Sequence, residues 1–357
     1  MILVNNPGSW SHIYAPLKHA PWHGLTPTDL VFPFFLFAVG NAMSFVMPRL
    51  EQAGPTFFWK KVLKRTALIF LIGLFLNWWP FVKPSDYTFK VFENVRLLGV
   101  LQRIALAYFF AAVIIYYLKG TKAFYAAMLF LLGYWALCLL GNPADPFSLE
   151  GWFGTNIDKA ILGVTHLYKG EGMPFDPEGL VSTFPAIAQV ILGYLVGTYI
   201  KEKGNAKDSL PTMLNGLFIV AIALLFTGFC WDMVMPINKK IWTSSYVVYT
   251  TGLATLTIAT MIYFIEIKGV KIGLSRFFDV FGKNALFVFA LSAFLPKGLT
   301  LIKLGEGVTP WNWLYKKVLV HTPGLPENGS LLYALAVISF MWWICRWMDK
   351  KRIYIKV

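Results

Sequence analysis

Charged side chains are scarce in this sequence of 357 residues: only 14% are Asp, Glu, Lys or Arg, whereas 57% are hydrophobic. A soluble domain is about a quarter charged and 45–50% apolar, so the composition excludes an ordinary soluble domain. Aromatic residues are plentiful, with 14 Trp, 16 Tyr and 31 Phe, and Trp and Tyr collect at membrane interfaces. Several apolar stretches reach the roughly 20 residues that cross a bilayer. We therefore expect an all-α, polytopic helical membrane bundle.

Cysteine is also rare, and several well-known motifs are missing. Cys138, Cys230 and Cys345 lie in separate apolar stretches without a CxxC pair, which excludes a disulfide framework and offers no metal-ligand spacing. The sequence contains no GxxxxGK[ST], GxGxxG, HExxH or GxSxG. We therefore expect no metal ion in the site.

Nine apolar segments, separated by polar or Pro/Gly-containing loops, are long enough to be complete spans. They cover about residues 28–48, 62–80, 97–118, 123–141, 181–200, 210–231, 244–265, 278–302 and 330–348. The longest loops are about 142–180 and 303–329. No internal repeat is evident, so we expect one transmembrane domain over 1–357.

The net charge of +14 reflects topology and not a nucleic-acid partner, because most Lys and Arg residues lie in short loops between apolar segments. Dense examples are the loop from Arg49 to Arg65 and the tail from Arg346 to Arg352. The positive-inside rule places these loops and the C-terminus in the cytoplasm. The loops 142–180 and 303–329, together with His19, are then on the outer face.

This orientation places Met1 outside, although no earlier segment would carry it across the membrane. Residues Met1 to Val4 also resemble the end of an apolar helix, because the turn-forming sequence Asn5-Asn6-Pro7-Gly8 follows them. We therefore expect a further first helix that precedes this sequence.

Two histidines and an aspartate stand directly before the first span. Nearby Pro and Gly residues place His19 and His23 in a loop, where a solvated side chain is the simpler interpretation. Their position beside Trp22 at the mouth of a bundle favours a general base, for which neutral imidazole is suited. Asp29 lies three residues after Thr26 and either completes a capping box or orients a histidine.

Two arginines lie around the third span. Arg96 and Arg103 are seven residues apart, which predicts one helical face. Arg103 is well inside the span, where an arginine costs about 2.5–3.5 kcal/mol without a partner or polar cavity. It therefore indicates either a functional site or a structural ion pair with Asp29 or Glu178.

Two further motifs carry polar groups near the ends of spans. Asp176 and Pro177 predict a helix cap and first helical position, and Glu178 adds an outer carboxylate. Lys283 and Asn284 stand near the cytoplasmic start of a span, where Lys283 either extends to the membrane surface or binds phosphate.

Residues 18–33, KHAPWHGLTPTDLVFP, resemble the signature of the heparan-α-glucosaminide N-acetyltransferase family. The resemblance continues, in order along the chain, in GVLQR at 99–103, DPEG at 176–179 and GKNA at 282–285. The family's fold begins with a helix bearing an Arg-Gly pair, which is absent here and which fits the expected missing helix.

The resemblance implies a transmembrane acyltransferase that takes acetyl from cytoplasmic acetyl-CoA and acetylates the amine of a terminal glucosamine on the far side. It implies a bacterial inner-membrane protein in contact with lipid, a homodimer, and an amino sugar or glycan end as acceptor. The family's catalytic histidine matches His19, and its asparagine matches Asn5, with Asn6 as a rival. Asp29 would orient His19.

The remaining candidates follow from the implied chemistry. We expect the sugar to contact Trp22, His23, Asp176 and Glu178. The outer loop's Trp152, His166, Tyr168 and Glu171 either stack on the sugar and hydrogen-bond it, cover it as a lid, or form a packing belt. CoA is anionic and should remain at the basic cytoplasmic face, with its arm directed toward His19. Candidate cofactor-binding residues are Lys64, Arg96, Gln102, Arg103, Asn41, Lys283 and Asn284.

Two other functions remain open from the sequence. A sugar or amino-sugar transporter would also carry intramembrane charge and helices broken by proline, but it commonly shows inverted repeats. A membrane scaffold is a weaker alternative, because it would not need a buried Arg103.

Overall fold

The computed structural model describes residues 1–204, 210–270 and 273–355, and these residues form helices and loops without a β-strand. The all-α class predicted from composition is therefore confirmed. The thirteen α-helices of the described residues are α1 Ile2–Asn5, α2 Val31–Gln52, α3 Pro55–Trp78, α4 Val100–Leu118, α5 Gly120–Gly141, α6 Gly154–Leu162, α7 Thr183–Lys203, α8 Leu210–Asp232, α9 Ser244–Ile262, α10 Gly273–Gly282, α11 Ala285–Leu299, α12 Trp313–Lys317 and α13 Pro326–Lys350. Short helical turns are η1 Ala15–Leu17, η2 Pro27–Leu30, η3 Phe92–Asn94, η4 Val164–His166, the π-helical η6 Tyr263–Ile267 and η7 Leu319–His321.

Seven helical segments among the described residues are long and apolar enough to cross a membrane. They include α2 with η2, α9 with η6, and α4, α5, α7, α8 and α13. This agrees with a polytopic membrane protein. The predicted segment 62–80 lies mostly in α3, which starts earlier, at Pro55, and ends at Trp78. This helix carries Lys61, Lys64 and Arg65 and is not one of the seven.

The predicted continuous span 278–302 is wrong in its shape. Residues Ser275–Gly282 and Ala285–Leu299 are bent by 79° relative to each other. The chain turns because Asn284 leaves the helical conformation and becomes the N-cap of α11. Counting the bent pair as one span gives up to eight among the described residues.

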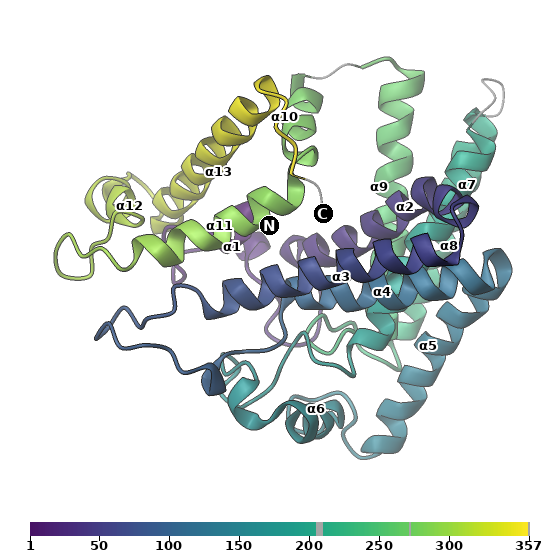
Figure 1. Cartoon of the computed structure of the whole chain (residues 1–357), viewed down its shortest axis with the longest axis horizontal. Coiled ribbons are helices and arrows are strands. Elements are labelled where there is room, and N and C mark those ends of the chain that lie inside the picture. The colour runs from purple at the N-terminus through teal and green to yellow at the C-terminus, as the bar shows by residue number, and fades with distance from the viewer. Residues whose placement is uncertain (205–209, 271–272, 356–357) are drawn as a thin grey trace.

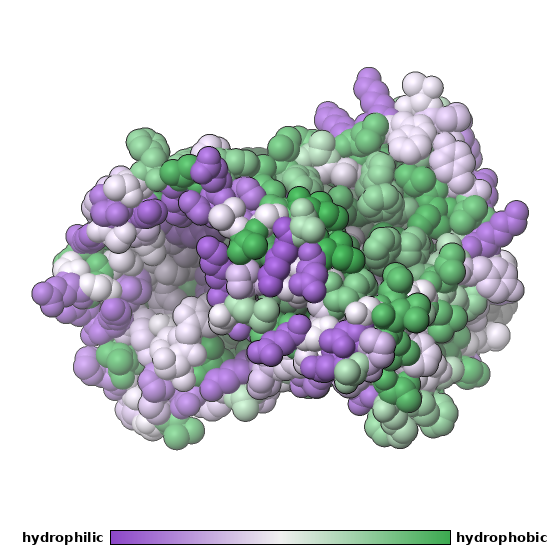
Figure 2. All heavy atoms as spheres, turned by 90° about the horizontal axis from the view of Figure 1, so that it is seen from below, coloured by the Kyte–Doolittle hydropathy of each residue, from purple (hydrophilic) through white to green (hydrophobic). Residues whose placement is uncertain are grey.

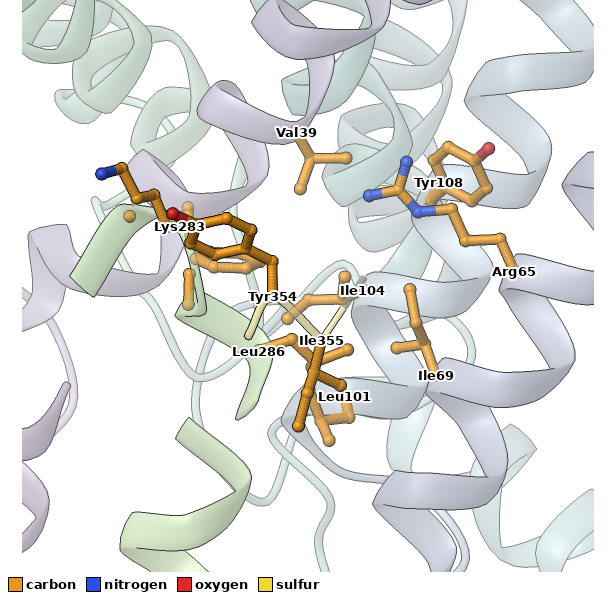
Figure 3. A pocket seen from close by; sticks show the side chains of 13 residues that line it. Val39, Arg65, Ile69, Leu101, Ile104, Tyr108, Lys283, Leu286, Tyr354 and Ile355 are labelled. Atoms are coloured by element: carbon orange, nitrogen blue, oxygen red, sulfur yellow. The ribbon is translucent and has the colours of Figure 1, made fainter. Parts of the chain in front are cut away.

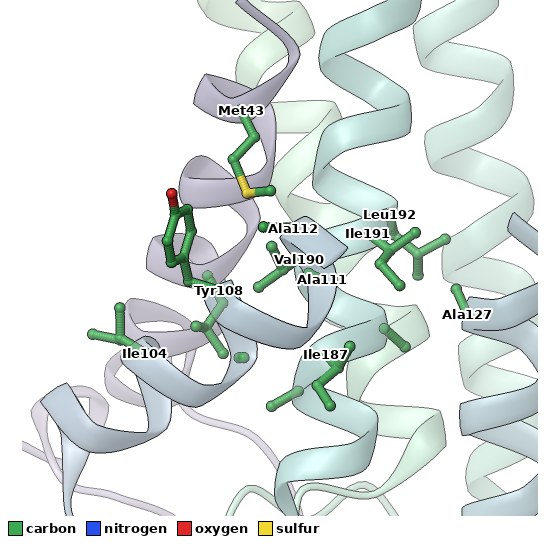
Figure 4. Close-up of a cluster of buried hydrophobic side chains, with 14 of the residues drawn as sticks. Met43, Ile104, Tyr108, Ala111, Ala112, Ala127, Ile187, Val190, Ile191 and Leu192 are labelled. Atoms are coloured by element: carbon green, nitrogen blue, oxygen red, sulfur yellow. The ribbon is translucent and has the colours of Figure 1, made fainter. Parts of the chain in front are cut away.

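Helix α7 packs closely against α2 because both expose glycine at the contact. An added Cβ on Gly40 of α2 would lie 1.9 Å from the carbonyl oxygen of Val190, and one on Gly193 would lie 2.2 Å from that of Phe37. Gly193 and Gly197 form a GxxxG pair, which is typical of closely packed membrane helices. Ile187, Val190 and Ile191 continue this core toward Ala111 and Ala112 of α4 (Figure 4). The tight contact fixes the start of α2 relative to the segment before α7.

The C-terminal ends of α7, α9 and α13 lie in the upper part of Figure 1, spread from one side to the other, whereas α6 of the loop 142–180 lies at the bottom. Large apolar side chains such as Leu129, Leu140 and Phe226 are exposed on helix surfaces. Seen from below, apolar side chains dominate much of the right side of the molecule and polar ones the left (Figure 2). Such an apolar surface suits contact with lipid.

Candidate active site

A cavity of about 390 Å³, here called the histidine pocket, opens among the loops that precede α2, α4 and α7 and the loop between α8 and α9. The acidic, basic, histidine and asparagine side chains on its wall come from five separate parts of the chain. They are Asn5, His19, Asp29, Arg96, Glu171, Glu178, Lys239 and Lys240. The fold therefore brings together His19, Asp29 and Asn5, the three residues predicted to be catalytic.

Asp29 holds His19 in a defined orientation. The carboxylate Oδ1 lies 2.6 Å from His19 Nδ1, while Oδ2 accepts from the backbone N–H of Ala20 at 3.0 Å and of Thr26 at 3.2 Å. The Thr26 hydroxyl also donates to Oδ2, at 3.0 Å. Both sequence interpretations of Asp29 are thus correct, since one oxygen completes the capping box of η2 and the other contacts the imidazole.

This geometry assigns different tasks to the two imidazole nitrogens. Asp29 is 1% exposed and, as a carboxylate, can only accept at His19 Nδ1. The Nδ1 proton therefore points to Asp29, and the Nε2 lone pair remains available to take a proton. The His19 side chain is 45% exposed, so this lone pair is accessible from the pocket.

Lys239 is a member of the site that sequence reasoning missed. Its Nζ lies 3.4 Å from Asp29 Oδ1 and 3.0 Å from His19 Nδ1. Burial lowers the pKa of Lys239, although the carboxylates of Asp29 and Glu178 act in the opposite direction. The available signal was the pair Lys239-Lys240 in a loop predicted on the outer face, where the positive-inside rule leaves few cations.

Arg96 anchors two carboxylates at the other side of the pocket. Its guanidinium donates to both oxygens of Asp176, at 2.9 and 2.5 Å, and also pairs with Glu178. Burial opposes the charge of Glu178, but Arg96 and Arg103 outweigh it and lower the pKa of this carboxyl. Asp176 itself is buried behind Arg96 and supports the wall without forming it.

Two helix predictions around these residues are wrong. Arg96 and Arg103 do not share a helical face, because α4 begins only at Val100, after Gly99. The Asn77 side-chain amide holds the preceding segment by donating to the carbonyls of Arg96 and Leu98.

Asp176 and Pro177 do not start a helix either, because α7 begins at Thr183. Asp176 instead closes a local turn, accepting the N–H of Glu178 with Oδ1 and that of Gly179 with its carbonyl. The carboxylate is therefore used for the turn and for Arg96, not for helix capping.

Arg103 is fully buried, and its guanidinium binds the turn that follows Asp176. Its Nη2 donates to the Ser182 hydroxyl and, at 3.1 Å, to the Gly179 carbonyl, and its guanidinium lies 5.0 Å from the Trp242 ring. Among the described residues it forms no ion pair with Asp29 or Glu178, so that structural alternative is wrong in its partners. Arg103 lines neither the histidine pocket nor the cavity described next.

A second cavity, of about 670 Å³ and here called the basic pocket, lies between α2, α3, α4, the start of α11 and the C-terminal segment. Arg65 and Tyr108 form one side, with the guanidinium 4.8 Å from the Tyr108 ring, and Lys283 and Tyr354 lie on the other (Figure 3). Arg65 Nε has no hydrogen-bond partner in the described part of the chain. Arg65 is a second functional candidate that the sequence interpretation overlooked in favour of Lys64.

The predicted cofactor-binding residues occupy different surroundings. Lys64 is exposed on α3 outside the basic pocket, and Asn41 and Gln102 face α7 and α3 without lining either cavity. Lys283 lines the basic pocket but pairs with Asp349 at 2.9 Å.

Asn284 binds the chain's own C-terminal segment. Its side chain donates to the Ile353 carbonyl at 3.1 Å and accepts the Ile355 N–H at 2.9 Å. Asn284 thus fastens the segment whose Tyr354 and Ile355 form part of the pocket wall.

The two cavities share the walls of three helices. On α2, Phe32 lines the histidine pocket and Phe35 lines the basic pocket. On α4, Val100 lines the histidine pocket and Leu101 lines the basic pocket. On α11 the corresponding residues are Phe289 and Leu286. On α2 and α11 the two residues are three apart, which is about 4.5 Å along the helix axis, and on α4 they are adjacent. At most about one helical turn therefore separates the cavities.

The predicted sugar-contacting residues are partly assembled. Trp22, Tyr168 and Glu171 line the histidine pocket together with Glu178, but His23 lies beside it and contacts Asn238 Nδ2 at 3.3 Å. Trp152 is 1% exposed in a buried apolar cluster, which agrees with the packing alternative and not with sugar stacking. His166 contacts the Val95 carbonyl at 2.7 Å instead of the pocket.

The described residues contain no group of three or more His, Cys, Asp or Glu side chains that could hold a metal ion. No family model matches the sequence. The heparan-alpha-glucosaminide N-acetyltransferase of Homo sapiens is 26% identical over an alignment of 411 residues, and the Mus musculus protein of the same name is 23% identical. Each alignment includes all of this chain, which spans 58% of the length of these curated relatives. The chain is therefore similar over its whole length to heparan-alpha-glucosaminide N-acetyltransferase, as its motifs indicated.

Proposed function

We propose that this protein transfers an acetyl group from cytoplasmic acetyl-CoA to the amine of a glucosamine-type sugar on the outer face of a bacterial inner membrane. The observation that carries the proposal is the juxtaposition of two cavities. One holds an oriented histidine, the other holds arginine and lysine, and about one helical turn or less separates them along α2, α4 and α11. Similarity to two N-acetyltransferases supports the same chemistry.

The basic pocket suits the nucleotide end of acetyl-CoA. Arg65 offers the charge and the unpartnered Nε–H that a phosphate recognises, and Tyr108 keeps the guanidinium in place. Apolar side chains such as Ile69, Ile104 and Leu286 cover the route toward the histidine pocket. A pantetheine arm would pass there with its thioester directed at His19.

The histidine pocket suits the acceptor amine. Glu178 and Glu171 provide carboxylates for an ammonium or for sugar hydroxyls, and Trp22 provides an aromatic face. The neutral amine nitrogen forms a bond with the thioester carbon while His19 Nε2 takes one proton from that nitrogen. The carbon–sulfur bond breaks as the tetrahedral intermediate collapses, and the sulfur takes the proton from His19. The direct ternary route and a transient acetyl-His19 remain two forms of this proposal.

A sided assay tests the proposal. The protein is reconstituted in vesicles, and labelled acetyl-CoA and glucosamine are placed on opposite sides of the membrane. Label should appear on the sugar only when acetyl-CoA faces the ends of α7, α9 and α13 that lie opposite α6. Counterflow of unmodified sugar without acetylation would contradict the proposal and favour a transporter.

A further inference from the structure

The amine of Lys239 lies beside the proposed base without blocking it. Nζ is 3.0 Å from His19 Nδ1 and 3.4 Å from Nε2. Because the two distances are nearly equal, Nζ lies alongside the ring and not on the lone-pair axis of Nε2. The Lys239 side chain is 21% exposed and forms part of the pocket wall. A cation is therefore fixed next to the nitrogen that takes the proton.

A compact turn fixes this position. The buried Asn238 accepts the N–H groups of Lys240 at 2.7 Å and Ile241 at 3.1 Å through Oδ1, and its own N–H donates to Thr243 Oγ1 at 2.9 Å. The Ile237 carbonyl accepts the N–H of Gly24, at 2.8 Å, which ties this turn to the loop that carries His19. Such support keeps Lys239 and His19 in constant relative positions.

Asp29 does not need Lys239 as a hydrogen-bond donor. Its two oxygens already face His19, the backbone N–H groups of Ala20 and Thr26, and the Thr26 hydroxyl. The neighbouring Lys240 differs, since it binds Glu171 at 2.5 Å and the Pro21 carbonyl at 2.7 Å. The contact between Lys239 and Asp29, at 3.4 Å, is longer, and Lys239 also lines the pocket.

We propose that the ammonium group of Lys239 binds the acetyl carbonyl oxygen and stabilises the negative charge that develops on it during transfer. This inference rests on the proposed acetyl transfer. As the amine nitrogen bonds to the carbonyl carbon, the carbonyl π electrons move to the oxygen beside Lys239, and His19 Nε2 receives the amine proton. The electrons return when the carbon–sulfur bond breaks, and the thiolate takes the proton from His19. A fixed charge aimed at the developing oxyanion is among the largest contributions to such catalysis.

The test compares Lys239→Met with Lys239→Arg in the full chain. Removal of one oxyanion-binding group costs about 10²–10³-fold in kcat, so we expect this loss in Lys239→Met. The dissociation constant of acetyl-CoA and the KM of the sugar should stay close to wild type, and Lys239→Arg should restore part of the rate. Lys316→Met is the matched control, because Lys316 contacts the Gly307 carbonyl outside both pockets and should leave activity unchanged.

A second donor separates this role from a merely structural one. Fluoroacetyl-CoA forms an oxyanion that its fluorine already stabilises, so the rate loss caused by Lys239→Met should be smaller than with acetyl-CoA. An equal loss with both donors would overturn the inference in favour of positioning through Asp29, as would a Lys239→Met protein with nearly wild-type kcat. No transfer by the wild type to any amino sugar would instead refute the proposed function. If Lys239→Met fails to fold, Lys239→Gln provides the same comparison.

Discussion

Replacing Asp29 by asparagine changes one atom of a buried side chain whose two oxygens have different partners. Oδ2 accepts from three donors on Ala20 and Thr26, whereas Oδ1 contacts His19 Nδ1. In Asp29→Asn the amide oxygen must face the three donors, because an amide NH₂ there would leave them without an acceptor. The NH₂ group must then face His19.

The expected loss follows from the tautomer that this arrangement imposes. An NH₂ donor at His19 Nδ1 requires Nδ1 to accept, so the imidazole proton moves to Nε2 and the base loses its lone pair. The same exchange in a serine-protease triad lowers kcat by about 10⁴. We therefore expect a loss of about 10³–10⁴ in kcat for Asp29→Asn. The fold should persist, since the three contacts to the capping box remain.

The assay measures transfer of label from acetyl-CoA to glucosamine under single-turnover conditions, alongside thermal unfolding of the purified protein. Asp86→Asn is the matched control, because Asp86 is exposed and its carboxylate accepts from Thr88 in its own loop. Retention of more than a tenth of the wild-type rate by a folded Asp29→Asn protein would refute the assigned tautomer.

Three further outcomes are expected. Gly40→Ala places a Cβ 1.9 Å from a backbone carbonyl of α7 and should lower the free energy of unfolding, measured by thermal denaturation, by about 1–3 kcal/mol. Gly133→Ala is the control and should not lower it, because Gly133 has open space around it. Equal stability of the two variants would contradict the close helix contact. Arg65→Met should weaken acetyl-CoA binding at least tenfold in equilibrium titration, and Lys64→Met should leave the dissociation constant unchanged. Weaker binding by Lys64→Met than by Arg65→Met would contradict the assignment of the nucleotide end to the basic pocket. Burial raises the pKa of Asp158 to about 6, so the folded state binds more protons than the unfolded state between about pH 4 and 6 and stability falls as pH rises. At pH 8 the free energy of unfolding of Asp158→Asn should therefore exceed that of wild type by up to about 3 kcal/mol, and thermal denaturation should show a higher midpoint. This gain should shrink toward pH 4. A gain independent of pH would contradict the raised pKa.

Local sequence was sufficient where the partners are close along the chain. His19 and Asp29 are ten residues apart, and the capping box in Thr26 to Asp29 fixes the carboxylate beside the loop. The all-α class and most spans were also predictable, because apolar length and interfacial aromatics report directly on the bilayer.

The errors arose where distant segments decide the local conformation. Arg96 fitted a helical face by spacing, yet it lies before α4, where Asn77 binds its carbonyl and its side chain reaches Asp176. Lys239 reaches His19 across 220 residues of sequence, and no periodicity reports such a contact.

Residues 282–284 also show that local sequence does not identify a distant partner. A basic motif at the start of a span favours phosphate, but Asn284 binds a segment that follows it by about seventy residues. The partner belongs to the same chain, so composition cannot distinguish the two uses.

The most direct measurement of the central claim uses His19→Ala. The purified variant is supplied with labelled acetyl-CoA and glucosamine, and both label transfer and acetyl-CoA binding are measured. Binding at the wild-type dissociation constant with transfer lost, by about 10²-fold or more as for a removed general base, is the predicted result. Transfer by His19→Ala at the wild-type rate would contradict the assignment of His19 as the base.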